Sequence, residues 1–297
     1  MIDGEDFRDH IKLFMSIAST FVMSSEKHSE AFNKINRTFG GLVTLIIQKL
    51  DSIVSSSVQR NKNKQTSKVM DELKMLYTES LNVIKFIVER SKIELSNYEI
   101  EALFRIYVEE SEYPEHGQDI LYNFFMKKRI NGITILNYQN KRFLFENILC
   151  SLTKINHSHL TLKAFHCFSY LFLYINMDED LLVFDKISIS KLFKFDDSEG
   201  GSTETSVNIR KNIGNLIEEV KSFGLLGLES LWRVISTTQY EDVLFQCEVF
   251  LSSIYYKLNI QHFNDVLIYE TFFEKVIMLM NQKESVASNL LHLLITF

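Results

Sequence analysis

The sequence predicts an all-α protein built from stacked antiparallel helix pairs. The 297 residues include one proline and ten glycines, and hydrophobic residues make up 46% of the chain. Sandwiches and barrels need glycine and proline at their many turns, so the scarcity of both favours long helices with short connections. Apolar residues also recur at helical intervals along nearly the whole chain, which is the periodicity of amphipathic helices.

Candidate helices follow one another with short polar breaks between them. In chain order they cover residues 5–24, 26–38, 41–58, 66–91, 97–110, 117–128, 141–155, 159–176, 206–223, 225–237, 240–259, 263–281 and 284–297. Gly40-Gly41 separates two of them, and the single proline, Pro114, marks a turn before another. The segment 195–205 (FDDSEGGSTET) is acidic and rich in Gly and Ser, which is typical of a mobile loop.

The helices are grouped here into N-terminal repeats at 1–130 and C-terminal repeats at 131–297. The final predicted helix ends on apolar residues with no polar outer face, whereas terminal units of repeat proteins have one. We therefore expect the repeats to continue in a longer parent chain.

A weak internal repeat indicates how the helices stack. When residues 143–176 are placed on 226–259, Leu160 meets Val243, Ala164 meets Cys247 and Phe168 meets Leu251. Each window has the form helix, short polar turn, helix. This is the unit of HEAT and armadillo proteins, so the sequence predicts a HEAT/armadillo-like α-solenoid.

The second helix of the first window shows why such a pair needs neighbours. Its apolar stripe contains residues 160, 164, 167, 168, 171, 172 and 175. Burying these side chains contributes roughly 1.5–3 kcal/mol each. Ordering the helix costs roughly 1–2 kcal/mol per residue, which is comparable in total, so packing against adjacent pairs has to supply the rest.

Charge and cysteine content limit the partners and the compartment. The formal net charge is −6 and the pI is near 5.8, which argues against nucleic acid as a partner. The three cysteines are widely separated, so neither a disulfide framework nor a zinc motif is expected. The polar, acidic N-terminus is unlike a signal peptide, and no apolar run is long enough to insert in a membrane. An intracellular location, cytoplasmic rather than nuclear, fits these features.

One cluster has the residue types of a metal site. His157, His159, His166 and Cys167 lie within eleven residues of one another. Cys167, however, falls on the apolar stripe, where a buried thiol behaves as a small hydrophobic side chain. Surface and capping roles explain the histidines better than metal binding does, and no metal is expected.

No other constellation supports catalysis or a cofactor. Asp196, Asp197 and Glu199 could suggest the Mg²⁺-binding motif of all-α prenyl diphosphate enzymes, but they lie in the acidic loop and lack a second cluster. Cys150 and Cys247 lie inside predicted helices rather than at the strained turn of a nucleophile. We therefore expect no catalytic residues and no cofactor in this segment.

One helix pair carries a family resemblance. A Gly-Leu-x-x-Leu-Trp motif begins at Gly227, an Glu-Asp-Val motif at Glu241 and an Ile-Tyr-x-x-Leu motif at Ile254. This pattern, within residues 224–259, resembles the non-catalytic helical-repeat arms of very large ubiquitin-specific proteases of the fat-facets type. Those arms usually have Ala where this chain has Cys247. The resemblance implies a segment separate from a thiol-protease domain, so no catalytic residue carries over.

These observations predict a protein–protein interaction scaffold, and the resemblance implies that it belongs to a large deubiquitinase and positions ubiquitinated substrates or other protein partners. Two alternatives are a helical-repeat fragment of a transport receptor or coat adaptor and, third, an all-α Mg-dependent prenyl enzyme. We expect partners to bind the face lined by the second helices of the pairs. From helix phase its outward residues are Lys163, His166, Tyr170, Gln246, Val249, Ser253 and Lys257. The sole Trp, Trp232, is expected to pack in the core.

Overall fold

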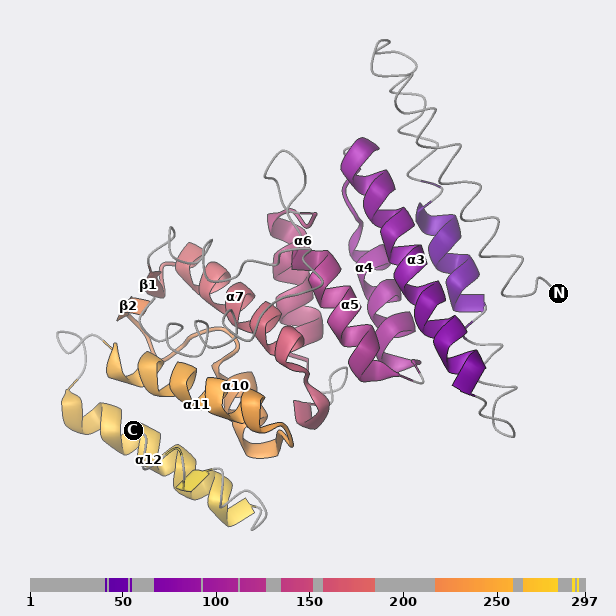
Figure 1. Ribbon diagram of the computed structural model, residues 1–297. Coiled ribbons are helices and arrows are strands. Elements are labelled where there is room, and N and C mark those ends of the chain that lie inside the picture. The colour runs from indigo at the N-terminus through magenta and orange to yellow at the C-terminus, as the bar shows by residue number, and fades with distance from the viewer. Residues whose placement is uncertain are drawn as a thin grey trace, which may run out of the picture. The chain divides into compact units, whose positions relative to one another are not determined.

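A computed structural model describes residues 41, 43–52, 54, 67–91, 93–111, 113–126, 135–151, 157–184, 217–258, 264–282, 290–291 and 293. Most of these residues are helical, which confirms the predicted helical class (Figure 1). The chain forms two compact units, Met1–Leu144 and Phe145–Phe297. The acidic loop 195–205 lies outside the described residues.

The first unit contains helical residues 41 and 43–52 followed by a series of longer helices. These are α3 (Ser67–Ser91), α4 (Asn97–Phe104) with the π-helix η2 (Arg105–Glu109), α5 (Pro114–Met126) and α6 (Tyr138–Phe143). Helix α4 begins in a capping box, in which the Ser96 side chain accepts from the Glu99 amide and the Glu99 carboxylate accepts from the Ser96 amide.

Two close contacts join the helices of the first unit. The Tyr107 hydroxyl, on η2, donates to the Tyr77 carbonyl of α3 at 2.9 Å. Gly117, in α5, passes so near η2 that a Cβ placed on it would meet the Tyr107 carbonyl oxygen. Glycine is therefore needed here for close packing and not for a turn.

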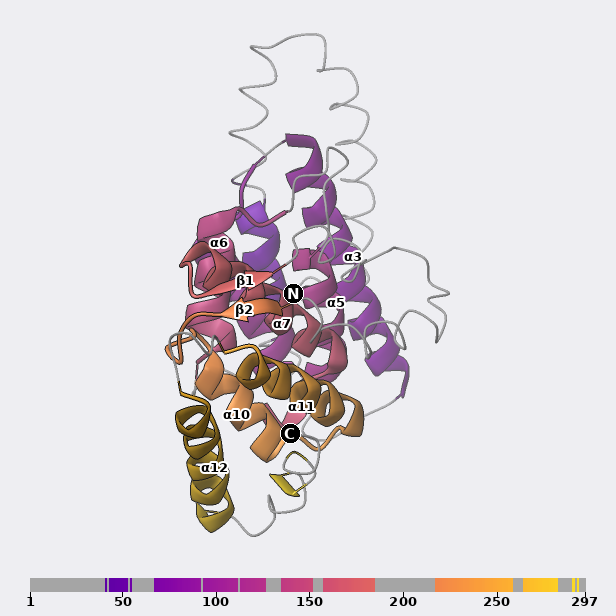
Figure 2. The ribbon, with the colours of Figure 1, turned by 90° about the vertical axis from the view of Figure 1, so that its left-hand side faces the viewer.

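The second unit contains a longer set of elements. They are the remainder of the π-helix η3 (Leu144–Leu149), the 3₁₀ turn η4 (His157–His159), α7 (Leu162–Asp178), β1 (Leu182–Phe184), β2 (Ile217–Val220), α10 (Leu228–Thr237), α11 (Glu241–Tyr256) and α12 (Asp265–Gln282). In Figures 1 and 2, α10, α11 and α12 lie beside one another.

The two strands correct one prediction. β1 and β2 pair in antiparallel fashion, and the Val220 amide also donates to the Lys257 carbonyl at 2.7 Å. The helix predicted at 206–223 is therefore wrong over its described end, residues 217–223. Ile217 and Val220 are buried, and tertiary pairing outweighs the helical preference of the two glutamates between them.

The core of the second unit is aromatic, and α7 runs through it. Phe145, Phe168, Phe172 and Phe250 form successive ring contacts with centroids 5.3–6.3 Å apart. All seven residues of the predicted α7 stripe are buried, which confirms that face. Burial extends beyond the stripe to most of the α7 surface, as expected for a central helix.

No helix in the part of the chain that the structure describes is both long and apolar enough to cross a lipid bilayer.

Candidate protein-docking site

The seven predicted partner-binding residues differ in their exposure to solvent. Lys163 is exposed, and four others are partly exposed: Tyr170, Val249, Ser253 and Lys257. His166 and Gln246 are buried, so the outward orientation predicted for these two is wrong.

The reason for this burial is that α7 and α11 pack against each other where helix phase alone placed a free surface. Nε2 of His166 lies 2.7 Å from Oε1 of Gln246, and this contact joins the two helices inside the unit. Burial lowers the pKa of the His166 imidazole, and the hydrogen bond to Gln246 offsets part of that effect. The pair is thus a structural contact between helices and cannot be reached by a partner.

The cysteines lack the environment of a nucleophile. Cys167 and Cys247 are fully buried, and burial raises the pKa of both thiols far above its usual value. The Cys247 thiol donates to the Leu231 carbonyl at 3.4 Å. Burial also raises the pKa of the partly exposed Cys150 thiol, to about 12. All three therefore remain protonated at neutral pH, whereas a nucleophilic cysteine needs a thiolate.

The residue cluster considered for a metal does not come together. Among the described residues, no group of three or more His, Cys, Asp or Glu side chains could hold a metal ion. His157 and Cys167 are buried and His159 is exposed. Residues 196, 197 and 199, considered for Mg²⁺, lie outside the described part of the chain.

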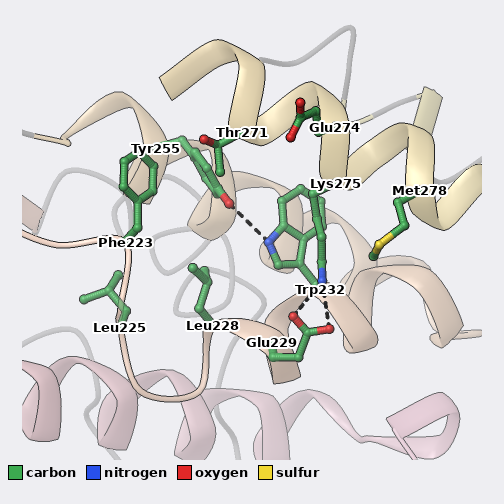
Figure 3. Close-up of a pocket in the computed structure, with 10 residues that line it drawn as sticks. All are labelled: Phe223, Leu225, Leu228, Glu229, Trp232, Tyr255, Thr271, Glu274, Lys275 and Met278. Atoms are coloured by element: carbon green, nitrogen blue, oxygen red, sulfur yellow. Dashed lines mark hydrogen bonds and ion pairs between the residues drawn. The ribbon is translucent and has the colours of Figure 1, made fainter. Parts of the chain in front are cut away.

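A groove beside α12 is a second candidate feature, and it was not predicted. It is open on one side, has a volume of about 460 Å³ and lies between α12, α10 and the segment that precedes α10 (Figure 3). We call it the α12 groove. Its lining residues are Phe223, Leu225, Leu228, Glu229, Trp232, Tyr255, Thr271, Glu274, Lys275 and Met278.

The floor of the α12 groove is a buried aromatic cluster. The Trp232 indole N–H donates to the Tyr255 hydroxyl at 3.3 Å, and the two rings meet edge to face at 5.9 Å. Phe272 of α12 contacts both rings, with centroids 5.5 Å from Trp232 and 5.0 Å from Tyr255. Trp232 is only 2% exposed, which confirms its predicted core position.

An ion pair and a carboxylate form the polar rim of the α12 groove. Lys275 Nζ lies 2.9 and 2.7 Å from the two carboxylate oxygens of Glu229, so it bridges α12 and α10. In Figure 3 the Lys275 side chain runs from α12 toward the Glu229 carboxylate. Glu274 is exposed on the same rim and has no ion-pair partner among the described residues.

The segment that precedes α10 forms one wall of the α12 groove, and Asn176 of α7 holds this segment in place. The Asn176 amide oxygen accepts from the Leu226 amide at 2.7 Å, and its NH₂ group donates to the Leu226 carbonyl at 2.9 Å. Gly227 follows with φ of 82°, and a Cβ there would come within 2.5 Å of the Phe145 ring. The left-handed backbone and this close approach both favour glycine, so the chain turns sharply into α10.

The outer surface of α12 carries an exposed apolar row. Val266, Tyr269, Phe273 and Ile277 are each between 44% and 57% exposed. Their spacing of three and four residues places them on one side of the helix, and we call them the α12 stripe. The buried positions Ile268, Phe272 and Val276 lie next to this row.

Two acidic side chains separate the stripe from the groove. At about 3.6 residues per turn, Glu270 and Glu274 fall between the stripe on one side and Thr271 and Met278 on the other. Both glutamates are exposed. Helix α12 therefore presents an apolar row on one flank of an acidic ridge and borders the groove on the other.

Comparisons with known proteins assign no family. A scan against models of protein families finds no match for the chain, and no curated protein matches its sequence significantly.

Sequence reasoning located α12 but missed its exposed face. The predicted helix 263–281 agrees closely with the observed Asp265–Gln282. The predicted partner surface included no residue of this helix, although its apolar residues surround more of the helix than one buried stripe needs. That excess of apolar positions is the signal that could have identified the site.

Proposed function

We propose that this chain is a non-catalytic scaffold for protein–protein interactions, and that partners dock on the surface of α12. The observation that carries the proposal is the α12 stripe. Isolated exposed apolar residues are ordinary on protein surfaces, whereas contiguous rows bordered by polar residues mark interaction sites. Here four apolar side chains share one side of a single helix, beside an acidic ridge and a groove with an aromatic floor.

The finer fold proposal is a HEAT/armadillo-like solenoid. It is supported by α10 and α11, two helices that pack together across a connection of residues 238–240, and by α12, which contacts both through Phe272. Repeat proteins commonly bind partners along the surfaces of successive helices.

The finer functional proposal is a helical arm of a large deubiquitinase. It rests on the sequence resemblance within residues 224–259, and the family comparisons do not add to it. Transcript sequencing beyond codon 297 tests it directly. We expect the reading frame to continue into a thiol-protease domain, and a stop codon after Phe297 would remove the proposal.

The docking proposal is tested by selecting phage-displayed helical peptides on the immobilised chain. We expect peptides that bind with micromolar affinity and lose about tenfold or more against the Tyr269→Ser/Ile277→Ser variant, because hot-spot residues at interfaces contribute at least this much. The matched control is Tyr256→Ser, because Tyr256 is also exposed in the second unit but lies on α11. Failure to enrich any peptide, or equal binding to both variants, would contradict the proposal.

A further inference from the structure

We propose that the α12 groove receives an apolar anchor residue of a basic amphipathic helix, with a lysine or arginine of that helix reaching Glu274. This inference rests on the proposed docking function and names the class of partner.

The lining of the groove suits a single bulky apolar side chain. Phe223 and Leu228 are partly exposed and Met278 is 42% exposed, so three apolar side chains border the opening. Trp232 and Tyr255 close the floor and are nearly inaccessible. The volume of about 460 Å³ is ample for one bulky apolar side chain. The open side favours a residue from a macromolecule, because a small ligand would remain largely in contact with water.

The charges around the groove favour a positively charged partner. Lys275 is held by both carboxylate oxygens of Glu229, so its charge is already matched. Glu274 remains exposed on the rim, with Glu270 one turn before it. An incoming lysine or arginine would meet a negative surface, and complementary charge speeds association as well as favouring the correct partner.

The same charges disfavour other occupants. A second copy of this chain packed through α12 would bring Glu270 and Glu274 toward their own equivalents. An anionic membrane surface would be repelled by the same ridge. The groove also runs beside helices and is not bordered by an open strand edge among the described residues, so a helix in the groove fits better than an added strand.

The spacing of the partner helix follows from helical geometry. An anchor residue in the groove and a basic residue three or four positions away lie on one side of a helix. That arrangement allows the apolar anchor to cover Met278 while the basic group reaches Glu274.

Two synthetic helical peptides of about 18 residues, or five turns, serve as probes. Both have the same leucine face and no tryptophan, and one carries lysine where the other carries glutamine. Binding is measured through the fluorescence of Trp232, the sole Trp of the chain and part of the groove floor. We expect the lysine peptide to bind about tenfold more tightly, and this advantage to shrink when salt rises from about 0.05 to 0.5 M.

Matched variants locate the site. Glu274→Lys and Met278→Ser should each weaken the lysine peptide by about five- to tenfold. Asp178→Lys changes the net charge by the same amount at an exposed position on α7, and Met75→Ser alters a methionine of similar exposure, 39%, on α3. Both control variants should bind the lysine peptide with an affinity within about twofold of that of the unmodified protein.

Three results would overturn the inference: equal binding of the two peptides, no effect of Glu274→Lys and Met278→Ser, or no binding of the lysine peptide. If peptides selected by phage display still bind and still depend on Tyr269 and Ile277, the docking function stands while this inference fails. If those peptides fail as well, both proposals fall.

Discussion

Replacing Phe272 by alanine should loosen α12 from the rest of the second unit. Phe272 is fully buried and contacts the rings of Trp232, Tyr255 and Phe273. It is the central member of the buried row of α12, between Ile268 and Val276. Its removal would leave a void between α12 and the aromatic floor of the groove.

The expected loss in the free energy of unfolding is about 4–5 kcal/mol, in the upper part of the range of about 3–5 kcal/mol for a core Phe→Ala change. The side chain is inaccessible, and its edge-to-face contact with the buried Tyr255 ring is worth about 0.5–1.5 kcal/mol beyond area burial. The adjacent residue provides the control. Phe273 is 44% exposed, so Phe273→Ala should change stability by less than about 1 kcal/mol.

Urea unfolding, followed by Trp232 fluorescence and by circular dichroism, measures both variants. Phe272→Ala should also shift the native emission of Trp232 to longer wavelength, because water reaches the indole. A loss below about 1 kcal/mol for Phe272→Ala, or equal losses for the two variants, would show that α12 does not pack on Trp232 as described.

Three further predictions concern other parts of the chain. Gly117→Ala should destabilise the protein by about 1–3 kcal/mol, because its Cβ would lie 1.7 Å from a carbonyl oxygen of η2. Gly41 is the control, since it is helical and a Cβ there would have nothing within 4 Å. Gly41→Ala should stabilise the protein by about 0.5–1 kcal/mol in the same urea assay. Because burial lowers the pKa of His166, the imidazole binds a proton more readily in the unfolded chain than in the folded one. The contribution of the neutral imidazole to stability is therefore complete above about pH 6.5 and is lost as pH falls toward the folded-state pKa. Urea titrations at a series of pH values should show a smaller loss of stability at low pH for His166→Gln than for the unmodified protein. In thiol labelling at neutral pH, Cys167 and Cys247 should react only after urea is added, and rapid labelling of either in the native protein would contradict its burial.

The sequence was a good guide where one periodic signal decided the structure. Helix α7 has its predicted stripe buried, and α11 begins and ends near the predicted limits because its apolar spacing is regular. Helix α4 and the π-helix η2 together match the predicted helix 97–110, although spacing alone gives no sign of the π-helical turn.

Prediction failed where contacts between distant segments decided the structure. Helix phase alone placed His166 and Gln246 outward, yet their mutual hydrogen bond allows both polar side chains to lie inside. β2 forms because Leu182 to Phe184 and the Lys257 carbonyl provide partners for its backbone, and neither partner is adjacent in sequence.

The candidate site was missed for a related reason. A single helix shows which residues are apolar but not how many of its sides are covered by neighbours. Ile268 and Phe273 are both large and apolar, and only the packing of α12 on α10 and α11 makes one buried and the other exposed. The Lys275–Glu229 pair likewise joins residues from different helices and has no local signature.

The Asn176 side chain gives the docking surface a property that its lining residues lack by themselves. Both main-chain groups of Leu226 are satisfied by the side-chain amide of Asn176, which is itself fully buried in α7. Phe223 and Leu225 therefore belong to a segment whose backbone conformation is fixed before a partner binds. The conformational entropy of this segment is lost during folding and not during binding. A partner that binds on this side should meet a preorganised site, so association should be fast and the backbone should rearrange little.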